Sequence, residues 1–338
     1  PSGNLKPIGL LHEYGETEQA EFGLFTGSWA KNVSGGVLRS NMKSFKTEVN
    51  TATNGTFTNA ADIVTTLNKL RIYGYRYSDG TYQGDGNCTF QLITDVANNM
   101  CTDWGNPMGE MFVESLRYLA GKTPSSDFDF TLSGSKDEQL GMPMPAWVDP
   151  FLRANETERA AVSAKFGPPH CRRINTVNFN SSIISFDEGL QTPLSTIGAG
   201  SLATLVNLIG ADEGIHGKNW FVGSNGSTDN RLCDAKSISS LSDVRGLCPD
   251  APAYKGTFGV AGAMHWAWMN PIRSDINSYG APDAFRVKSY NVALSLGKPR
   301  IAIKHPTSGK VIELQPSFLN AKSPTAYGSG TLIDFKVI

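Results

Sequence analysis

Charge is scarce in this chain, and neither sign dominates. Only 18% of the 338 residues are Asp, Glu, Lys or Arg, and 30 basic against 31 acidic residues leave a formal net charge of −1. Soluble domains usually carry about 25% charged residues. Because nucleic acid requires a concentrated basic surface, this balance argues against a nucleic-acid partner.

Long apolar runs and the common catalytic motifs are also missing. The longest apolar stretch, residues 258–269, is interrupted by Gly262 and His265 and is shorter than the roughly 18 residues that a membrane-spanning helix needs. The sequence contains no HExxH, no CxxC and no Gly-x-Ser-x-Gly, which argues against a zinc protease, a zinc knuckle and a serine-hydrolase elbow. The sequence therefore favours a non-enzymatic protein, although a triad assembled from distant residues stays open.

Small and turn-forming residues are abundant instead. The chain has 35 Gly and 18 Pro, a composition that favours many loops between short elements. It starts Pro-Ser-Gly, with neither Met nor a signal peptide. We therefore expect a mature or excised piece of a secreted or surface protein.

The five cysteines predict two local disulfides. Cys88 and Cys101 enclose one polar loop, and Cys233 and Cys248 enclose another. Closing loops of this size stabilises a fold by roughly 3 kcal/mol, and such bonds indicate an oxidising compartment. Cys171 is left over, as a buried thiol or as the partner of a cysteine outside this chain; we favour the second reading.

Hydrophobic spacing predicts helices and strands in alternation up to about residue 280. One helix is expected to start near Thr58. Three more are expected at 107–120, 201–212 and 256–269. Strands are expected at 20–26 and toward the end of 174–186, where a buried strand would deliver residues 187–189 to a turn. Residues 37–54 give no strand pattern. After residue 285 strands are expected at 286–294, 300–304, 310–314 and 331–338, so an α/β layer fold with a β-rich tail is predicted.

Two polar residues lie where α/β folds bind ligands. Asn106 precedes the expected helix at 107–120, and Asp187 follows an expected strand. Ligand sites of open α/β sheets lie beyond the carboxyl ends of strands, and two oxygen ligands there would suit Mg²⁺ or Ca²⁺. The alternative is structural, because Asn before Pro caps helices and Asp after a strand often makes a turn.

Aromatic residues in polar loops form a second group of candidates. Four of them could stack on sugars or become buried at a protein interface: Tyr75, Tyr77, Tyr82 and Trp220. Ordinary packing within the fold is the alternative.

Longer segments of the sequence resemble the PilC/PilY family of type IV pilus tip-associated adhesin and assembly proteins. The resemblance covers roughly residues 6–300. It is carried by eight segments: 25–39, 54–57, 70–75, 104–110, 114–121, 145–150, 217–223 and 244–249.

This resemblance implies a von Willebrand factor A-like α/β domain, that is, a Rossmann-like layered sheet with long disulfide-tied loop insertions. We expect this domain at residues 1–284, with a β-rich C-terminal extension or the start of the next domain at 285–338. Such domains bind a metal through Asp-x-Ser-x-Ser after their first strand, a Thr before a helix and a later Asp. Asn106 resembles the second element and Asp187 the third, but Asp-x-Ser-x-Ser is absent. A degenerate Mg²⁺ or Ca²⁺ site and a first strand missing upstream are therefore expected.

The same resemblance implies a role outside the cell. It suggests a tip-located, non-enzymatic component of the pilus that supports assembly and attachment to host or abiotic surfaces. The implied partners are minor pilins of the tip complex and the remainder of the same protein, including an upstream segment and a propeller domain. The alternatives from the residues alone are a secreted α/β hydrolase and a glycan-binding module.

Overall fold

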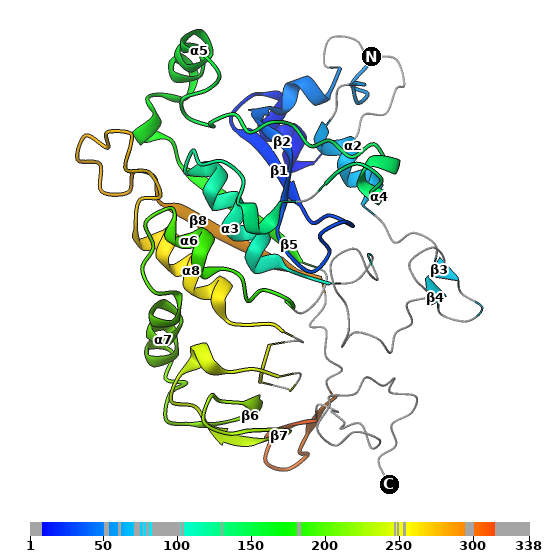
Figure 1. The fold of residues 1–338 in the computed structure, drawn as a ribbon, viewed down its shortest axis with the longest axis vertical. Helices are drawn as coiled ribbons and strands as arrows, with labels where there is room; N and C mark the ends of the chain where they lie inside the picture. Colours follow the sequence, from blue (N-terminus) through cyan, green and yellow to red (C-terminus); the bar gives the residue numbers. More distant parts are fainter. Residues whose placement is uncertain are drawn as a thin grey trace.

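The computed structural model describes most of the chain, and all structural statements below concern that part. The described residues are 9–50, 54–59, 62–70, 75–76, 78, 81–82, 102, 105–129, 131–180, 184–246, 248, 250–252, 255–294 and 301–314. The expected Cys88–Cys101 bond, Tyr77 and the expected strand at 331–338 lie outside them. Within the described residues the fold is mixed α/β, built from short helices and small sheets (Figure 1).

The elements follow one another in this order along the chain. The helices are α1 (Leu10–Glu16), α2 (Asp62–Lys69), α3 (Met108–Leu119), α4 (Lys136–Gln139), α5 (Glu156–Phe166), α6 (Gln191–Ser195), α7 (Leu202–Asp212) and α8 (Gly259–Met269). The strands are β1 (Glu21–Thr26), β2 (Val37–Ser44), β3 (Tyr75–Arg76), β4 (Thr81–Tyr82), β5 (Ile174–Asn180), β6 (Asn219–Ser224), β7 (Asp229–Ser237), β8 (Val287–Ala293), β9 (Ile301–Lys304) and β10 (Val311–Leu314). None of the described helices is long and apolar enough to cross a membrane.

The described strands form five two-stranded sheets. Four are antiparallel: β1–β2, β3–β4, β6–β7 and β9–β10. The fifth pairs β5 with β8 in parallel, with Ile174 opposite Val287 and Phe179 opposite Val292. Parallel pairing brings together segments more than 100 residues apart. The expected domain boundary at 284/285 lies between these two strands in the sequence, so the pairing joins the two expected domains. The division into domains itself stays a prediction.

The largest core forms around α3, whose existence follows from its sequence. Its apolar residues recur at helical spacing, and Phe112, Val113 and Leu116 are at most 1% exposed. Burying side chains of this size stabilises the fold by about 2 kcal/mol each. Helix α3 packs against α6 and α8, and α8 packs on β8, so these helices gather along one face of the β5–β8 pair (Figure 1).

The strand β5 differs from its expectation. The segment 174–186 was expected to have a buried strand at its end, but β5 covers its beginning, and the described residues at its end, 184–186, are not in a strand although Ser185 and Phe186 are buried. Within β5 only Ile174 is buried, while Val177 and Phe179 are largely exposed. That part of the prediction is wrong. Val177 and Phe179 lie on one face of β5, and the described residues place no element over that face.

The strand β2 was not expected, because residues 37–54 look polar. In the structure Arg39 and Ser40 of β2 are completely buried. Arg39 donates from Nη2 to Asp137 and from Nε to the Thr26 hydroxyl. A charged residue can lie in a core when its donors are satisfied in this way, and those partners are invisible to local periodicity.

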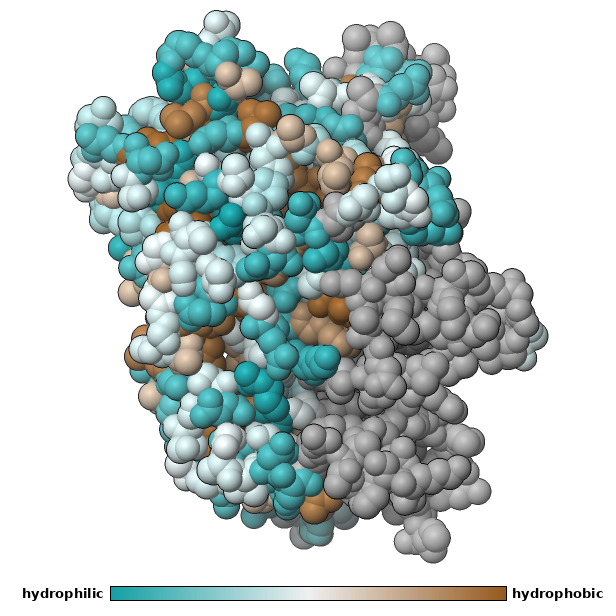
Figure 2. Space-filling view, in the orientation of Figure 1, coloured by the Kyte–Doolittle hydropathy of each residue, from teal (hydrophilic) through white to brown (hydrophobic). Residues whose placement is uncertain are grey.

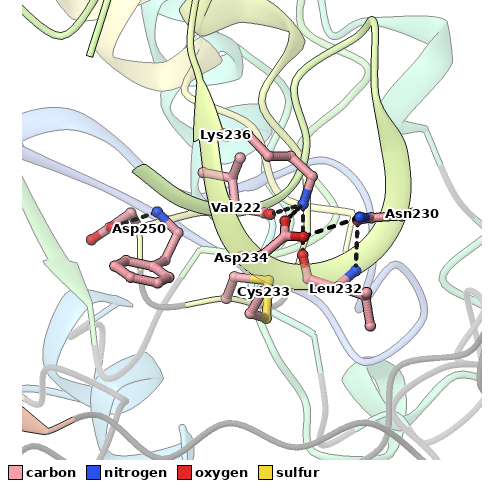
Figure 3. Close-up of a disulfide and its surroundings, with 9 residues drawn as sticks. Val222, Asn230, Leu232, Cys233, Asp234, Lys236 and Asp250 are labelled. Carbon is pink, nitrogen blue, oxygen red and sulfur yellow. Dashed lines mark hydrogen bonds and ion pairs between the residues drawn. A yellow bond between two sulfur atoms is a disulfide. The ribbon is translucent and has the colours of Figure 1, made fainter. Parts of the chain in front are cut away.

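A second, smaller core lies under the β6–β7 hairpin. It contains Val206 of α7, Val222 of β6, Ile238 and the disulfide between Cys233 and Cys248. The structure thus contains the bond that the loop spacing predicted. Beside it, Lys236 donates to the carbonyls of Val222 and Leu232 at 2.8 and 2.7 Å (Figure 3). The disulfide and the lysine together stabilise this hairpin.

The surface seen in Figure 2 is mixed. Hydrophilic residues cover much of the described part of this face, and hydrophobic residues gather in scattered patches between them. This agrees with a chain of mean hydropathy −0.23 and nearly balanced charge.

Candidate functional site

Three loops meet at the amino-terminal end of α3. They are residues 105–107 before α3, residues 184–190 after β5, and residues 255–258 before α8. Two backbone bonds join them: Ser185 N–H donates to the Asn106 carbonyl at 3.0 Å, and Asp187 N–H donates to the Lys255 carbonyl at 3.2 Å. The two residues that sequence reasoning selected, Asn106 and Asp187, therefore lie in neighbouring, hydrogen-bonded loops.

Asn106 links its loop to the end of β5. Its side-chain amide donates to the Asn180 side-chain oxygen at 2.8 Å, and its backbone N–H donates to the Ser185 hydroxyl at 3.1 Å. Neither bond is a side-chain cap of α3, for which no capping side chain is found. Asn106 thus fixes the approach of β5 to α3.

Asp187 is completely buried, and its two carboxylate oxygens differ. Oδ1 accepts from the Thr257 backbone N–H at 2.6 Å. Oδ2 has no hydrogen-bond partner within the described residues. A buried carboxylate oxygen without a donor is rare and unfavourable. Burial raises the pKa of Asp187 to about 7, against the opposing effect of the Thr257 bonds.

A second buried carboxylate, Glu110 of α3, lies beside Asp187. Its oxygens accept from the backbone N–H groups of Gly35 and Gly189. Burial raises the pKa of Glu110 to about 7, and the charge of Asp187 contributes to the increase. Each carboxylate therefore disfavours ionisation of the other.

The packing around Asp187 leaves no room for a residue larger than glycine at position 109 of α3. A Cβ atom at Gly109 would lie 3.0 Å from both Cβ and Oδ2 of Asp187. In addition, Phe186 and Lys255 both adopt positive φ, at 53° and 49°. Non-glycine residues in that region are uncommon and cluster at functional sites. The backbone on both sides of the Asp187–Lys255 bond is thus held in an uncommon conformation.

These residues fit part of a cation site. Carboxylate and amide oxygens suit Mg²⁺ and Ca²⁺, and Asp187 Oδ2 is a buried oxygen without a donor. However, the described residues contain no group of three or more His, Cys, Asp or Glu side chains that could hold a metal ion. Asp187 could therefore supply one ligand, with Asn106 as the second candidate, and a complete set needs oxygens beyond the described carboxylates.

The other candidates of the sequence lie elsewhere. Trp220 is half-buried and donates its indole N–H to the Ile215 carbonyl at 3.1 Å, so part of its surface packs in the smaller core. Tyr75 and Tyr82 belong to the paired strands β3 and β4, whose side chains are outside the described part. Cys171 lies after α5, is exposed and has no disulfide partner among the described residues, so the reading as a buried thiol is wrong, and its pairing with a cysteine outside this chain stays a prediction.

Sequence reasoning missed Glu110, although a signal was present. Glu110 and Glu114 stand four residues apart on the helix that was expected to be apolar, and both are nearly completely buried. Carboxylates at this spacing on an otherwise apolar helix lie on one face. That pattern could have marked the helix as part of a polar site.

Comparisons with known proteins agree with the resemblance of the sequence. Residues 22–267 match the family model described as "PilY1 homolog, second domain". The chain belongs to the PilY1 homolog family. A member from Xylella fastidiosa (strain Temecula1 / ATCC 700964), described as "Type IV pilus biogenesis factor PilY1 homolog", is 30% identical over 350 residues, which cover 98% of this chain.

The family protein is much longer than the region compared. This PilY1-family chain spans 22% of the length of the Xylella fastidiosa relative. No solved structure matches the chain.

Proposed function

We propose that this chain is part of a non-enzymatic component of bacterial type IV pili, located at the pilus tip outside the cell, that supports pilus assembly and attachment to surfaces. The observation that carries the proposal is its family: a relative aligned over 98% of the chain is described as a type IV pilus biogenesis factor. Minor pilins and a host or abiotic surface are the partners that fit this role.

The arrangement of the larger core supports the finer proposal of a von Willebrand factor A-like domain. Such domains place helices against a parallel sheet, with ligand-binding loops beyond the carboxyl ends of strands. Here β5 and β8 are parallel, α8 packs on β8, and Asp187 follows β5. We further propose that Asp187 and Asn106 contribute to a Mg²⁺ or Ca²⁺ site there.

A genetic experiment tests the pilus role. The natural gene is altered in its bacterium so that the region of residues 22–267 is deleted in frame, and sheared surface pili and twitching motility are measured. We expect loss of both. The same deletion in a strain that cannot retract its pili separates assembly from attachment. If pili remain normal in number and twitching and binding to surfaces are unchanged, the proposed role is wrong.

A titration tests the metal proposal separately. Isothermal titration of the chain with Mg²⁺ or Ca²⁺ should show binding that Asp187→Asn removes. Asp137→Asn, which changes another completely buried aspartate that belongs to none of the three loops, is the matched control and should retain the binding. Absence of binding to the unaltered chain would remove the metal proposal and leave the pilus role untouched.

A further inference from the structure

The β5–β8 pair has one face that the described residues leave bare. Side chains of paired residues in a parallel sheet point to the same side, so Val177 lies beside Tyr290 and Phe179 beside Val292. With Leu294 just after β8, these five residues form what we call the bare sheet face. Their exposed fractions are 70% for Val177, 61% for Phe179, 46% for Tyr290, 42% for Val292 and 64% for Leu294.

The opposite face of the same pair shows what a covered face looks like. There Ile174 and Val287 are buried in the large core, and the polar residues bond across the strands: Thr176 to Ser289 and Asn178 to Asn291, both at 3.0 Å. Asn291 also reaches Met264 of α8. One face therefore lies under a helix, whereas the more apolar face has no described element upon it.

Such an arrangement is unusual for a parallel sheet. Parallel strands occur almost only where elements cover both faces of the sheet. Single exposed apolar side chains are ordinary, but five of them adjacent on one sheet face make a patch typical of interaction sites. The described sheet also has only two strands, so further strands could extend it at either edge.

We propose that the bare sheet face is the docking surface for the polypeptide that precedes this region in PilY1 homologs, their first domain. The matching family model is that of a second domain, and the relative has most of its length outside the region aligned with this chain. A preceding segment of the same polypeptide is present at high effective concentration. It can supply an apolar layer over the face, or a further parallel strand with its crossover.

Protection from a diffusible probe tests the docking. Hydroxyl-radical labelling with mass spectrometry is carried out on the 338-residue chain and on the gene product of natural length. Phe179 and Tyr290 should be labelled at least tenfold more slowly in the longer protein. Tyr279, 75% exposed in a loop, is the control and should be labelled similarly in both. Equal labelling of Phe179 and Tyr290 in the two proteins would overturn the proposal.

Two other occupants give different results in the same experiment. Protection of Phe179 in the 338-residue chain that increases with protein concentration means that a second copy covers the face. Protection of Phe179 in the 338-residue chain at every protein concentration means that another part of this chain covers the bare sheet face. Either outcome overturns the proposal.

A paired variant gives a second, independent test. Phe179→Lys with Val292→Glu replaces two exposed residues, paired across the strands, by side chains of opposite charge, so the 338-residue chain should keep its thermal midpoint. In the protein of natural length the same pair should raise the labelling of Tyr290 to that of the short chain, whereas Tyr279→Asp should not. Unchanged protection of Tyr290 contradicts docking on this face. If the pair unfolds the short chain, the labelling of the unaltered proteins decides.

Discussion

Asp137 and Asp187 are both completely buried, yet their surroundings differ. Asp137 interacts with the guanidinium of Arg39 and also accepts from the Ser28 hydroxyl at 2.8 Å and the Trp29 N–H at 3.0 Å. Asp187 accepts one backbone N–H on Oδ1 and nothing within the described residues on Oδ2. The two carboxylates are therefore equally buried but differ in the number of hydrogen-bond donors that they accept from.

That difference separates a structural charge from a candidate functional one. A buried carboxylate with a cation and several donors recovers much of the free energy of its lost hydration. One without them remains partly unsatisfied, and such groups often mark binding sites. The Asp137 cluster fastens β2 to α4, whereas the Asp187 cluster lies where three loops meet.

The largest effect is expected from breaking the satisfied cluster. Arg39→Met leaves Asp137 buried without its cation and should lower the free energy of unfolding by about 3–5 kcal/mol, measured by urea denaturation. The control is Arg173→Met, which removes the exposed pair with Asp283 and should cost less than about 1 kcal/mol. Equal losses in the two variants would mean that burial of the Arg39–Asp137 pair adds nothing.

Glu48 is a second satisfied carboxylate. It is completely buried and accepts from the backbone N–H groups of Asp62, Ile63 and Val64 in the first turn of α2, with Lys43 at 3.1 Å. Hydrogen bonds to a charged group are the stronger ones. Glu48→Gln should therefore lower the free energy of unfolding by about 2–3 kcal/mol, seen as an earlier urea midpoint at pH 8. An unchanged midpoint would show that the charge is unimportant there.

The two clusters also differ in how well the sequence predicts them. Helices α3 and α8 follow from apolar spacing, and Asn106 and Asp187 follow from their places at element ends. Strand β2 was missed because Arg39 finds its partner Asp137 98 residues away in sequence. Glu110 was missed because a glutamate on a helix usually points to solvent. The burial of this segment was misjudged because an apolar pattern does not say whether another element covers the apolar face of β5.

Glu114 sharpens the comparison through pH. Burial raises its pKa to about 7, although the Ser125 N–H and Arg117 oppose the shift. The folded state then binds more protons than the unfolded state between about pH 4.5 and 7, so stability falls as pH rises through this window. Glu114→Gln should remove a fall of about 2 kcal/mol between pH 5 and 8. Urea midpoints measured across that range check this, and a variant that falls as steeply as the parent contradicts it.

Asp187→Asn is the most direct test of the comparison, although its effect is the smallest. Removing a buried charge that has a single donor should raise the free energy of unfolding at pH 8 by about 1 kcal/mol. Asn keeps an oxygen that can accept from the Thr257 N–H. A neutral buried group without a hydrogen-bond partner also costs less free energy than a charged one. Asp137→Asn is the matched change and should lower stability, since Arg39 then lacks its anion. Urea midpoints in the presence of a chelator measure both. If Asp187→Asn destabilises the fold as much as Asp137→Asn does, Asp187 is held by donors that its geometry does not reveal. If it destabilises only when Mg²⁺ or Ca²⁺ is added to the parent and variant alike, the orphan oxygen is a cation ligand.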